Sequence, residues 1–244
     1  MLEARNLTVE VNGRIVVEDV SFTLSSGEIV VFMGPNGSGK TSLAYALMGH
    51  PAYKVVKGSI IIDGEDYTGR PAYERALAGL FLAFQNPVEA PGVTLEILLK
   101  SALNKRLGKT DLSESIPGLS SRLRSEAILL GLKEDILARD LNIGFSGGEK
   151  KRSEILQARI LKPRYLILDE VDSGLDVDGI RLLADYINEV VGGGGGVLLI
   201  THSPSLLKLV SPRVVYVIHR GRVVLSGGIE VAEKISAEGY SWLR

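Results

Sequence analysis

Alternating apolar and polar positions at the start of the chain predict β-strands. Leu7, Val9 and Val11 are separated by polar residues, as in a strand with one face toward a core. The run EIVVFM is apolar throughout and is typical of a strand buried on both faces. We therefore expect strands over residues 5–11, 14–24 and 28–33.

Helical and extended patterns alternate through much of the remaining sequence. KTSLAYALMG predicts a helix that ends at Gly49, GSIIIDGEDY predicts a strand pair turning at Asp63-Gly64, and GLFLAF at 79–84 predicts a central strand. The later expected elements are helix 146–161, strand 164–169, helix 177–191, strand 197–201, helix 204–210, strands 213–225 and a C-terminal helix. This alternation favours an α/β fold with a mostly parallel core sheet and an antiparallel N-terminal β subdomain.

Two segments differ from this alternation. Residues 86–142 are rich in helix formers and charge, with Pro87, Pro91 and Pro117 between them, and we interpret them as a helical subdomain inserted into a single domain over 1–244. The run GGGGG at 192–196 is interpreted as a flexible surface connector. A second phosphate loop is disfavoured there because no lysine or helix start follows it.

Composition excludes several classes of protein. The 244 residues include 28 basic and 29 acidic side chains, for a net charge of -1, which argues against an electrostatic nucleic-acid binder or a polybasic membrane anchor. Apolar runs such as LAGLFLAF are far shorter than a membrane span. With no signal-peptide core either, we expect a soluble cytoplasmic protein without membrane insertion. The absence of cysteine excludes disulfides and cysteine-ligated metal or iron–sulfur sites within this chain.

A phosphate-binding loop is predicted at GPNGSGKT, residues 34–41. The motif has the G-x-x-x-x-G-K-[ST] spacing and lies between a predicted strand and a predicted helix, which is the context that it requires. Gly34, Gly37 and Gly39 allow the backbone amides to turn inward toward phosphate. Lys40 is expected to meet the β and γ phosphates, and the Thr41 hydroxyl to bind Mg²⁺. The alternative is a tight glycine turn without a ligand.

Acidic and imidazole side chains follow two of the predicted strands. YLILDE ends in Asp169, expected to hold the Mg²⁺ shell through water, and Glu170, expected to polarise an attacking water. His202 follows VLLIT and is placed to hydrogen-bond the γ phosphate or that water. Acids that merely solubilise a strand end and a structural histidine are the alternatives. His50 and His219 have no comparable context.

A second glycine-rich stretch, GFSGGEKKRSEILQ at 144–157, is unusual in its charges. Gly147 and Gly148 start a predicted helix whose first turns carry Lys150, Lys151 and Arg152. A helix N-terminus already bears about half a positive charge, so cations are unfavourable there unless an anion is close. The pattern therefore raises the question of why one chain needs two such loops.

Six motifs in order resemble those of the ATPase domain of ABC proteins. They are GPNGSGKT, FQ at 84–85, FSGGE at 145–149, LILDE, SGLD at 173–176 and THS at 201–203, and the resemblance covers nearly the whole chain. The resemblance implies a P-loop NTPase fold, bound ATP and Mg²⁺, and ATP hydrolysis to ADP and phosphate.

The same resemblance assigns roles to individual residues. The implied nucleotide-binding residues are Gly34, Pro35, Asn36, Gly37, Ser38, Gly39, Lys40, Thr41 and Ser42. The implied catalytic residues are Glu170, His202 and Lys40, and the implied Mg²⁺ residues are Thr41, Gln85 and Asp169. The implied signature loop is formed by Ser146, Gly147, Gly148 and Glu149, and Asp176 is placed in a loop at a dimer interface.

This resemblance answers the question of the second loop. In the family two subunits pack head to tail, and each ATP lies between the phosphate loop of one chain and the signature loop of the other. Lys150, Lys151 and Arg152 then either face that anionic interface or form a solvated face, in which Lys150 pairs with Glu154 four residues away. Both interpretations stay open from the sequence.

Several segments resemble one branch of the family more narrowly. FQNPVEAPGV, FSGGEKKRSEILQ, LDEVDSGLDVDG and the tail EGYSWL are similar to the ATPase subunit of the SUF iron–sulfur cluster assembly machinery. That likeness implies a motor that moves a soluble SUF scaffold, with a second copy of itself and the scaffold subunits as partners.

Alternative functions share part of the pattern. The nucleotide-binding subunit of a membrane ABC transporter would carry every catalytic residue named above. A nucleotide-dependent interaction module without turnover is disfavoured because Lys40, Glu170 and His202 are all present. A DNA-repair ATPase would need a long heptad insertion, which this chain lacks. Val11 stands where most of the family has an aromatic residue stacked on adenine, so modest ATP-over-GTP selectivity is expected.

Overall fold

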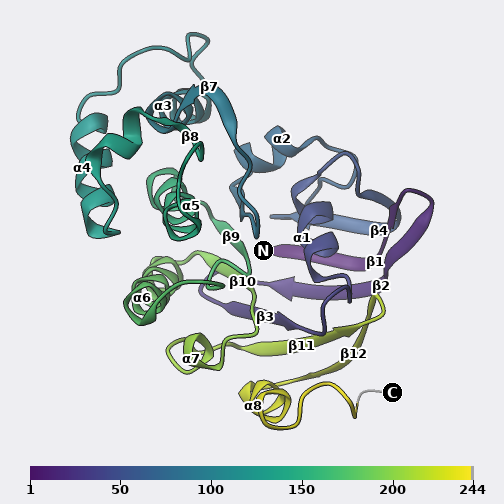
Figure 1. The fold of residues 1–244 in the computed structure, drawn as a ribbon. Coiled ribbons are helices and arrows are strands. Elements are labelled where there is room, and N and C mark those ends of the chain that lie inside the picture. The colour runs from purple at the N-terminus through teal and green to yellow at the C-terminus, as the bar shows by residue number, and fades with distance from the viewer. Residues whose placement is uncertain (243–244) are drawn as a thin grey trace. The chain divides into compact units, whose positions relative to one another are not determined.

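The computed structural model describes residues 1–242, and the last residue of the tail motif EGYSWL, Leu243, lies outside the described residues. The chain divides into two compact units (Figure 1). Unit 1 comprises Met1–Gln85, Pro163–Ser173 and the chain from Ala184 onward, and unit 2 comprises Asn86–Lys162 and Gly174–Leu183.

The first sheet of unit 1 is antiparallel. Its four strands lie in the order β2-β1-β4-β5 and are β1 (Leu2–Val11), β2 (Arg14–Leu24), β4 (Lys54–Ile62) and β5 (Glu65–Asp66). The register places apolar residues opposite one another, for example Val9 opposite Val17. β4 and β5 form the predicted hairpin around Asp63-Gly64, in which Ile62 pairs with Glu65. The antiparallel N-terminal subdomain is therefore present.

The second sheet of unit 1 has six strands in the order β12-β11-β3-β10-β9-β6. They are β3 (Ile29–Met33), β6 (Leu80–Ala83), β9 (Tyr165–Asp169), β10 (Gly196–Ile200), β11 (Val214–His219) and β12 (Arg222–Gly227). All neighbouring pairs are parallel except β11 with β12. Strands β3, β9 and β10 are buried at every position, which explains their continuous apolar sequences.

Helices cover the sheets of unit 1. α1 (Lys40–Met48) contacts strands of both sheets, so it lies between them (Figure 1). Leu43 and Leu47 of α1 share one buried cluster with Val9 of β1 and Phe32 of β3. α8 (Ile229–Glu238) packs on β11 and β12 and touches α7 (Pro204–Leu207). The first residue of α1 is the predicted phosphate-loop lysine, so this core fixes the loop.

Unit 2 is mostly helical. It contains α3 (Leu95–Arg106), α4 (Leu119–Leu129), a short 3₁₀ helix (Glu134–Ala138), α5 (Gly147–Leu161) and the start of α6 (Val177–Gly192). The segment 86–142, which was expected to be helical, also contains a small antiparallel strand pair, β7 (Ala90–Thr94) with β8 (Asp140–Leu141). Thr94 caps α3 by accepting a hydrogen bond from the Ile97 amide.

Besides the β7–β8 pair, the structure departs from the sequence expectations in three further places. The short helix α2 (Ala72–Leu77) was not expected, and α7 ends at Leu207 rather than at 210. The connector interpretation of 192–196 is wrong for its last two glycines. A Cβ on Gly195 would lie 2.6 Å from a Val190 methyl group, and one on Gly196 would lie 2.8 Å from the Ser25 carbonyl. Close packing, rather than flexibility, therefore requires glycine at these two positions.

Arg75 of α2 completes the C-terminal end of α1. Its guanidinium is 3% exposed and donates to the carbonyls of Ala46 and Leu47, each at 2.7 Å. Burial, partly opposed by Asp66, lowers the pKa of Arg75 to about 10, so the side chain stays charged at neutral pH. A buried cation at this terminus donates to carbonyls of the last helical turn, of which that of Ala46 also accepts from the Gly49 amide, and it complements the helix dipole.

We predict that Arg75→Gln lowers the free energy of unfolding by about 2–4 kcal/mol, because buried carbonyls of α1 lose a charged donor. Urea denaturation measures this change. Arg70→Gln is the matched control, since the Arg70 side chain is 43% exposed and pairs only at the surface. The control should change stability by less than about 0.5 kcal/mol. Equal losses in both variants would contradict the proposed cap.

Candidate functional site

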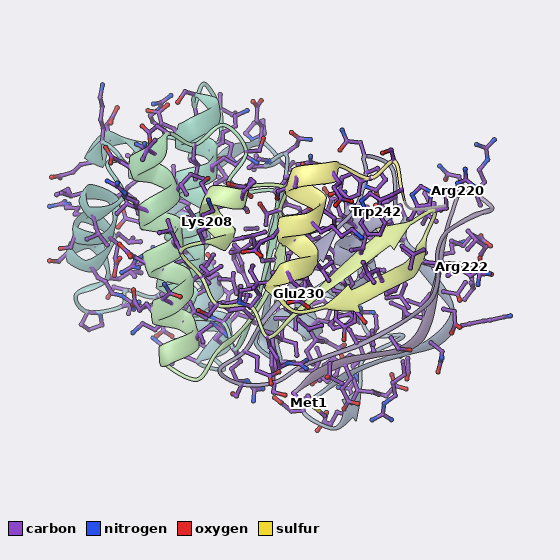
Figure 2. The ribbon with its side chains drawn as sticks, turned by 90° about the horizontal axis from the view of Figure 1, so that it is seen from below. Met1, Lys208, Arg220, Arg222, Glu230 and Trp242 are labelled. Atoms are coloured by element: carbon purple, nitrogen blue, oxygen red, sulfur yellow. The ribbon has the colours of Figure 1, made fainter. Side chains whose placement is uncertain are left out.

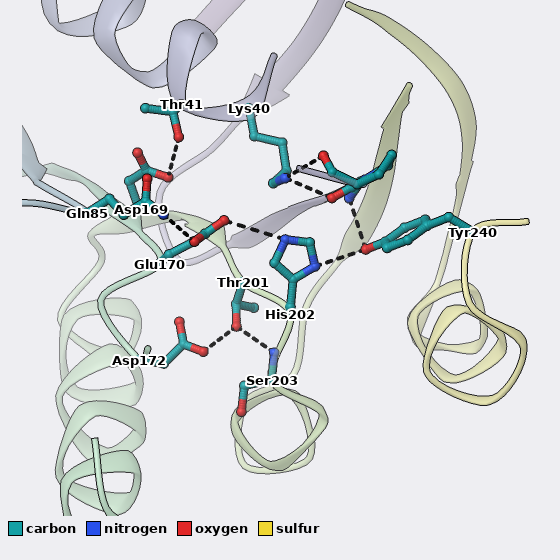
Figure 3. Close-up of polar contacts among 12 residues, drawn as sticks. Lys40, Thr41, Gln85, Asp169, Glu170, Asp172, Thr201, His202, Ser203 and Tyr240 are labelled. Carbon is teal, nitrogen blue, oxygen red and sulfur yellow. Dashed lines mark hydrogen bonds and ion pairs between the residues drawn. The ribbon is translucent and has the colours of Figure 1, made fainter. Parts of the chain in front are cut away.

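The register of three parallel strands brings distant residues to one edge of the second sheet. Ile200 of β10 pairs with Phe32 of β3 on one side and with Asp169 of β9 on the other. The residues that follow these positions leave the sheet at the same edge, the carboxyl end where α/β sheets bind ligands. The predicted loop at 34–41, Glu170 and His202 therefore meet within unit 1 (Figure 3).

A cavity of about 500 Å³ lies over the predicted phosphate loop. Its lining consists of Ile15, Val16, Asn36, Gly37, Ser38, Gly39, Lys40, Thr41, Ser42, Gln85, Glu170, Arg220 and Gly221. The loop has no room for side chains at Gly34 and Gly39, where a Cβ would lie 2.1 Å from the Ile218 carbonyl oxygen and 2.6 Å from the Val16 carbonyl oxygen. The first amides of α1 have no partner inside the helix, so the cavity floor offers donors suited to an anion.

The tip of the β11–β12 hairpin supports the loop from outside. The Gly221 amide donates to the Ser38 carbonyl at 2.8 Å, and the Glu18 amide donates to the Gly221 carbonyl at 2.7 Å. Figure 2 shows Arg220 and Arg222 at this tip. The hairpin was expected only as strands, and no pattern in its sequence announced this contact.

Lys40 supplies a buried cation at the cavity. The residue is 4% exposed, and its ammonium donates to the carbonyls of Gly34 at 2.7 Å and Pro35 at 3.2 Å. Burial lowers the pKa of Lys40, and the nearby carboxylates of Glu170 and Asp169 oppose that shift. The loop carbonyls thus hold the ammonium against the cavity wall.

The two predicted acids differ in their surroundings. Asp169 is 1% exposed and accepts a hydrogen bond from the Thr41 hydroxyl at 3.3 Å. Glu170 has a left-handed backbone conformation, with φ of 49°, and its amide donates to the Ile200 carbonyl at 2.9 Å. The Gln85 amide nitrogen donates to Glu170 Oε2 at 2.5 Å. A non-glycine residue at positive φ is strained, and such strain is concentrated at functional sites.

His202 faces the same carboxylate. Its Nε2 lies 3.5 Å from Glu170 Oε1, and partial burial, reinforced by Lys40, lowers its pKa. The loop that carries it is held by Thr201, which is fully buried and donates to Asp172 at 2.7 Å. The Thr201 hydroxyl also accepts a hydrogen bond from the Ser203 amide at 2.9 Å. Thr201 and Asp172 thus orient His202, a role that the THS motif did not reveal.

Tyr240 is a site residue that the sequence did not predict. Its hydroxyl lies 3.1 Å from the Gly34 amide and 3.0 Å from His202 Nδ1 (Figure 3). The tail motif EGYSWL was the available signal, but a tyrosine outside any regular element carries no spacing that points to a site.

The oxygen atoms at the cavity fit a Mg²⁺ site that phosphate and water complete better than a metal site formed by protein ligands alone. Within residues 1–242, no group of three or more His, Cys, Asp or Glu side chains can hold a metal ion. Thr41 and Asp169 instead offer a hydroxyl and a buried carboxylate side by side, with Gln85 on the same cavity wall. Mg²⁺ is commonly held by one or two such oxygens together with substrate phosphates and water.

The predicted signature residues lie in unit 2, at the N-terminus of α5. Ser146 and Glu149 form a capping box, in which the Ser146 amide donates to the Glu149 carboxylate at 2.8 Å and the Glu149 amide donates to the Ser146 hydroxyl at 3.2 Å. The hydrogen bond from the Ser146 amide is the largest cause of a lowered pKa at Glu149. A Cβ added at Gly147 or Gly148 would meet nothing within 4 Å. Packing within the chain therefore does not require glycine there.

Two of the cations that follow, Lys150 and Arg152, are paired within unit 2. Lys150 bonds to Glu89 at 2.8 Å, so the pair with Glu154 considered from the sequence is not the one formed. Arg152 lies 3.6 Å from Asp176, the predicted interface residue, whose Oδ1 accepts from the Gly179 amide in the first turn of α6. Carboxylates of unit 2 thus offset the positive charges of Lys150 and Arg152, which are unfavourable at a helix N-terminus.

Comparison with known proteins identifies the family. The family described as ABC transporter matches residues 17–173. The chain is 44% identical over 243 residues to vegetative protein 296 of Bacillus subtilis, covering 100% of this chain and 93% of the relative. This chain belongs to the ABC transporter family of ATP-binding proteins.

Other relatives agree with this assignment. A probable ABC transporter ATP-binding protein of Streptococcus pyogenes serotype M3 is 43% identical, covering 99% of this chain and 94% of the relative. The solved ATP-binding subunit of an ABC transporter has a TM-score of 0.78 at 27% identity, covering 98% and 95% of the two chains. A cassette solved as a dimer with ADP and phosphate has a TM-score of 0.75 at 20% identity, covering 94% and 99%, and shows the fold alone. The expected ABC ATPase fold and the ATPase activity are confirmed. The described helices include none with the length and apolar character needed to cross a membrane.

We predict modest discrimination between ATP and GTP. The described cavity lining contains Ile15 and Val16 but no aromatic ring, and Val11 is not part of it. Phosphate contacts should then provide most of the binding energy. Competition binding measures the preference. A preference for ATP above about a hundredfold, roughly 2.7 kcal/mol, would contradict this prediction and indicate that another residue, such as Arg220, contacts the base.

Proposed function

We propose that this ATPase is Mg²⁺-dependent, acts as a head-to-tail dimer of two copies, and moves a soluble SUF-type scaffold that assembles iron–sulfur clusters. The observation that carries the hydrolytic part is the convergence of Gln85 and Glu170 at a cavity whose floor is the Lys40 loop, with His202 3.5 Å from the Glu170 carboxylate. We also propose that residues 1–244 form one ABC ATPase domain, with residues 86–142 as its helical subdomain.

Phosphate binding is assigned to the loop from Gly34 to Ser42. The part of the loop from Asn36 to Ser42, with Lys40, lines one cavity, so its backbone and the Lys40 ammonium stabilise the charge on the β and γ phosphates as it shifts during transfer. The ammonium exchanges its bonds to the Gly34 and Pro35 carbonyls for phosphate oxygens when ATP enters. A loop shaped in advance by its glycines needs little rearrangement for this step.

Water activation is assigned to Glu170. Its carboxylate accepts from Gln85 and faces His202, so the group is oriented at the cavity edge. As a general base it takes a proton from the water that attacks the γ phosphorus, a role worth about 10²–10⁴ in rate. Gln85 and His202 hold the carboxylate and the water in line. Thr41, Asp169 and Gln85 would hold Mg²⁺, and the ion would neutralise negative charge on the phosphates.

The signature loop is assigned to the ATP bound by a second copy. Gly147 and Gly148 leave the start of α5 open to close approach, and the helix dipole favours an anion there. Ser146, Glu149 and Asp176 belong to the same proposed interface. The dimeric ADP-bound and phosphate-bound cassette, which shares the fold, supports such an arrangement.

The scaffold partner is supported by sequence likeness alone. FQNPVEAPGV, the signature helix and the tail are similar to the SUF ATPase subunit, and a chain without cysteine needs partners to hold a cluster. The alternative is the nucleotide-binding subunit of a membrane transporter. The Streptococcus relative, a probable ABC transporter ATP-binding protein, supports it. Purification of the native complex separates them. Soluble partners with iron and sulfide support the first function, and integral membrane partners support the second.

We predict that Glu170→Gln still binds MgATP but hydrolyses it very slowly, because the amide cannot accept the proton from water. The closed dimer should then accumulate, which gel filtration with ATP detects. The exposed Glu65→Gln is the control and should retain wild-type activity. A monomeric profile at high protein concentration, with ATP shown to be bound, would count against both the base and the shared site.

We predict complementation between two inactive variants. Lys40→Ala damages the phosphate loop and Ser146→Arg blocks the signature loop, so each homodimer should be nearly inactive. A mixed dimer contains one site built from two intact halves. The ATPase rate at fixed total protein should therefore peak near equal proportions.

A chain that carries both changes is the control for this mixture. Paired with wild type, it damages both shared sites but leaves the wild-type chain intact. Shared sites predict inactive pairs, whereas sites within one chain predict retained activity. A flat, inactive profile of the first mixture, despite demonstrated mixed dimers, would exclude independently working shared sites.

A further inference from the structure

The C-terminal segment returns to the phosphate loop after α8. Gly239 ends that helix with φ of 70°, a left-handed conformation that favours glycine, and its amide donates to the Ile235 carbonyl. Trp242 fixes the turn, because its indole nitrogen donates to the Gly239 carbonyl at 2.8 Å and the Lys234 ammonium lies 4.1 Å from its ring centre. Figure 2 shows Trp242 beside the end of α8. The half-buried Tyr240 is thereby directed at the site.

The Tyr240 hydroxyl lies between a fixed donor and a ring nitrogen of His202. The Gly34 amide can only donate, so the hydroxyl oxygen accepts from it at 3.1 Å. The hydroxyl proton is then available to His202 Nδ1, 3.0 Å away. An imidazole that accepts at Nδ1 and is neutral carries its hydrogen on Nε2.

The other side of the imidazole favours the same tautomer. His202 Nε2 lies 3.5 Å from Glu170 Oε1, and a carboxylate oxygen favours a facing N–H over a nitrogen lone pair. Burial raises the pKa of Tyr240, and partial burial with Lys40 lowers the pKa of His202, so both groups are uncharged at neutral pH. Gly34, Tyr240 and His202 therefore form a chain of hydrogen bonds that ends with His202 Nε2 3.5 Å from Glu170 Oε1 (Figure 3).

We propose that Tyr240 is a positioning residue for ATP hydrolysis, which holds His202 as the Nε2–H tautomer and ties it to the first residue of the phosphate loop. The proposal rests on the proposed function, since His202 acts there on the water or the γ phosphate. Tyr240 touches neither. It ensures that His202 presents a donor, rather than a lone pair, toward Glu170 and the cavity.

The geometry favours positioning over packing as the role of the hydroxyl. The two rings meet edge to face with centroids 6.1 Å apart, a contact that phenylalanine would keep. Tyr240→Phe thus removes the two hydrogen bonds and preserves the ring. The Gly34 carbonyl is held independently by Lys40, so the variant leaves one anchor of the loop in place.

Nitrogen-15 spectroscopy of the full chain tests the tautomer without turnover. The protein has three histidines, and loss of one signal set in His202→Gln assigns His202. Two-bond proton–nitrogen spectra of the nucleotide-free wild type should show His202 protonated at Nε2 and unprotonated at Nδ1. In Tyr240→Phe the two nitrogens should move toward a tautomer mixture.

Steady-state kinetics test the consequence for hydrolysis. Tyr240→Phe should lower kcat about tenfold, as expected for one lost orienting hydrogen bond, with the KM for ATP nearly unchanged. Adding it to His202→Gln should cause no further loss, because the group that it orients is absent. Tyr216→Phe is the matched control, since it removes a hydroxyl from a half-buried tyrosine stacked on Phe32 and should change neither readout.

Three results would overturn the proposal. These are an Nδ1–H tautomer in the wild type, an unchanged spectrum or kcat in Tyr240→Phe, and a faster rate in that variant, which would show that Tyr240 restrains His202. The spectra are recorded without ATP, so they remain decisive even if Glu170→Gln shows that Glu170 is not the base. Failure of the general-base assignment and failure of the Tyr240 proposal are thus distinguishable.

Discussion

The parallel alignment of β3, β9 and β10 is the constraint on which the site depends. Ile200 is paired with both Phe32 and Asp169, so all three strands end at one level. Because side chains alternate between faces, a shift of one residue would move every side chain of a strand to the opposite buried face and disrupt the packing on both faces. The buried apolar runs prevent such a shift, and the ladder thereby positions Lys40, Glu170 and His202 from segments far apart in the sequence.

Charges gathered at this edge compensate one another. Lys40 and Asp169 are almost fully buried, which would be costly for either group alone. The loop carbonyls bind the ammonium, and Asp169 and Glu170 oppose the loss of its charge. Two hydrogen bonds hold the strained backbone of Glu170. Its amide donates to the Ile200 carbonyl, and its carbonyl accepts from the Ser173 amide. These contacts hold the site in one arrangement without a ligand. Such preorganisation lowers the reorganisation needed in a reaction.

The two glycine-rich loops of the sequence belong to different units of the structure. The phosphate loop lies in unit 1, where buried neighbours dictate glycine at Gly34 and Gly39. The proposed signature loop lies in unit 2, where a Cβ added at Gly147 or Gly148 would meet nothing within 4 Å. The same residue type therefore serves internal packing in one loop and leaves the other accessible from outside. Membership of the ABC transporter family, together with this contrast, supports a site completed by a second molecule.

The sequence by itself predicted the strands, the phosphate-loop motif and the set of polar residues at the strand ends, because these depend on local spacing and on apolar runs that are visible along the chain. The ATPase family followed instead from the resemblance of six ordered motifs, and the family comparison confirms it. It did not reveal the Arg75 cap on α1, the hairpin tip at Gly221, the close packing of Gly195 and Gly196, or the Thr201–Asp172 bond. Tyr240 is the clearest case, because its partners, Gly34 and His202, are 206 and 38 residues away. Only the tertiary structure could decide these contacts, since each joins groups whose local sequences contain no periodic or spacing signal and whose proximity arises from the packing of the whole unit.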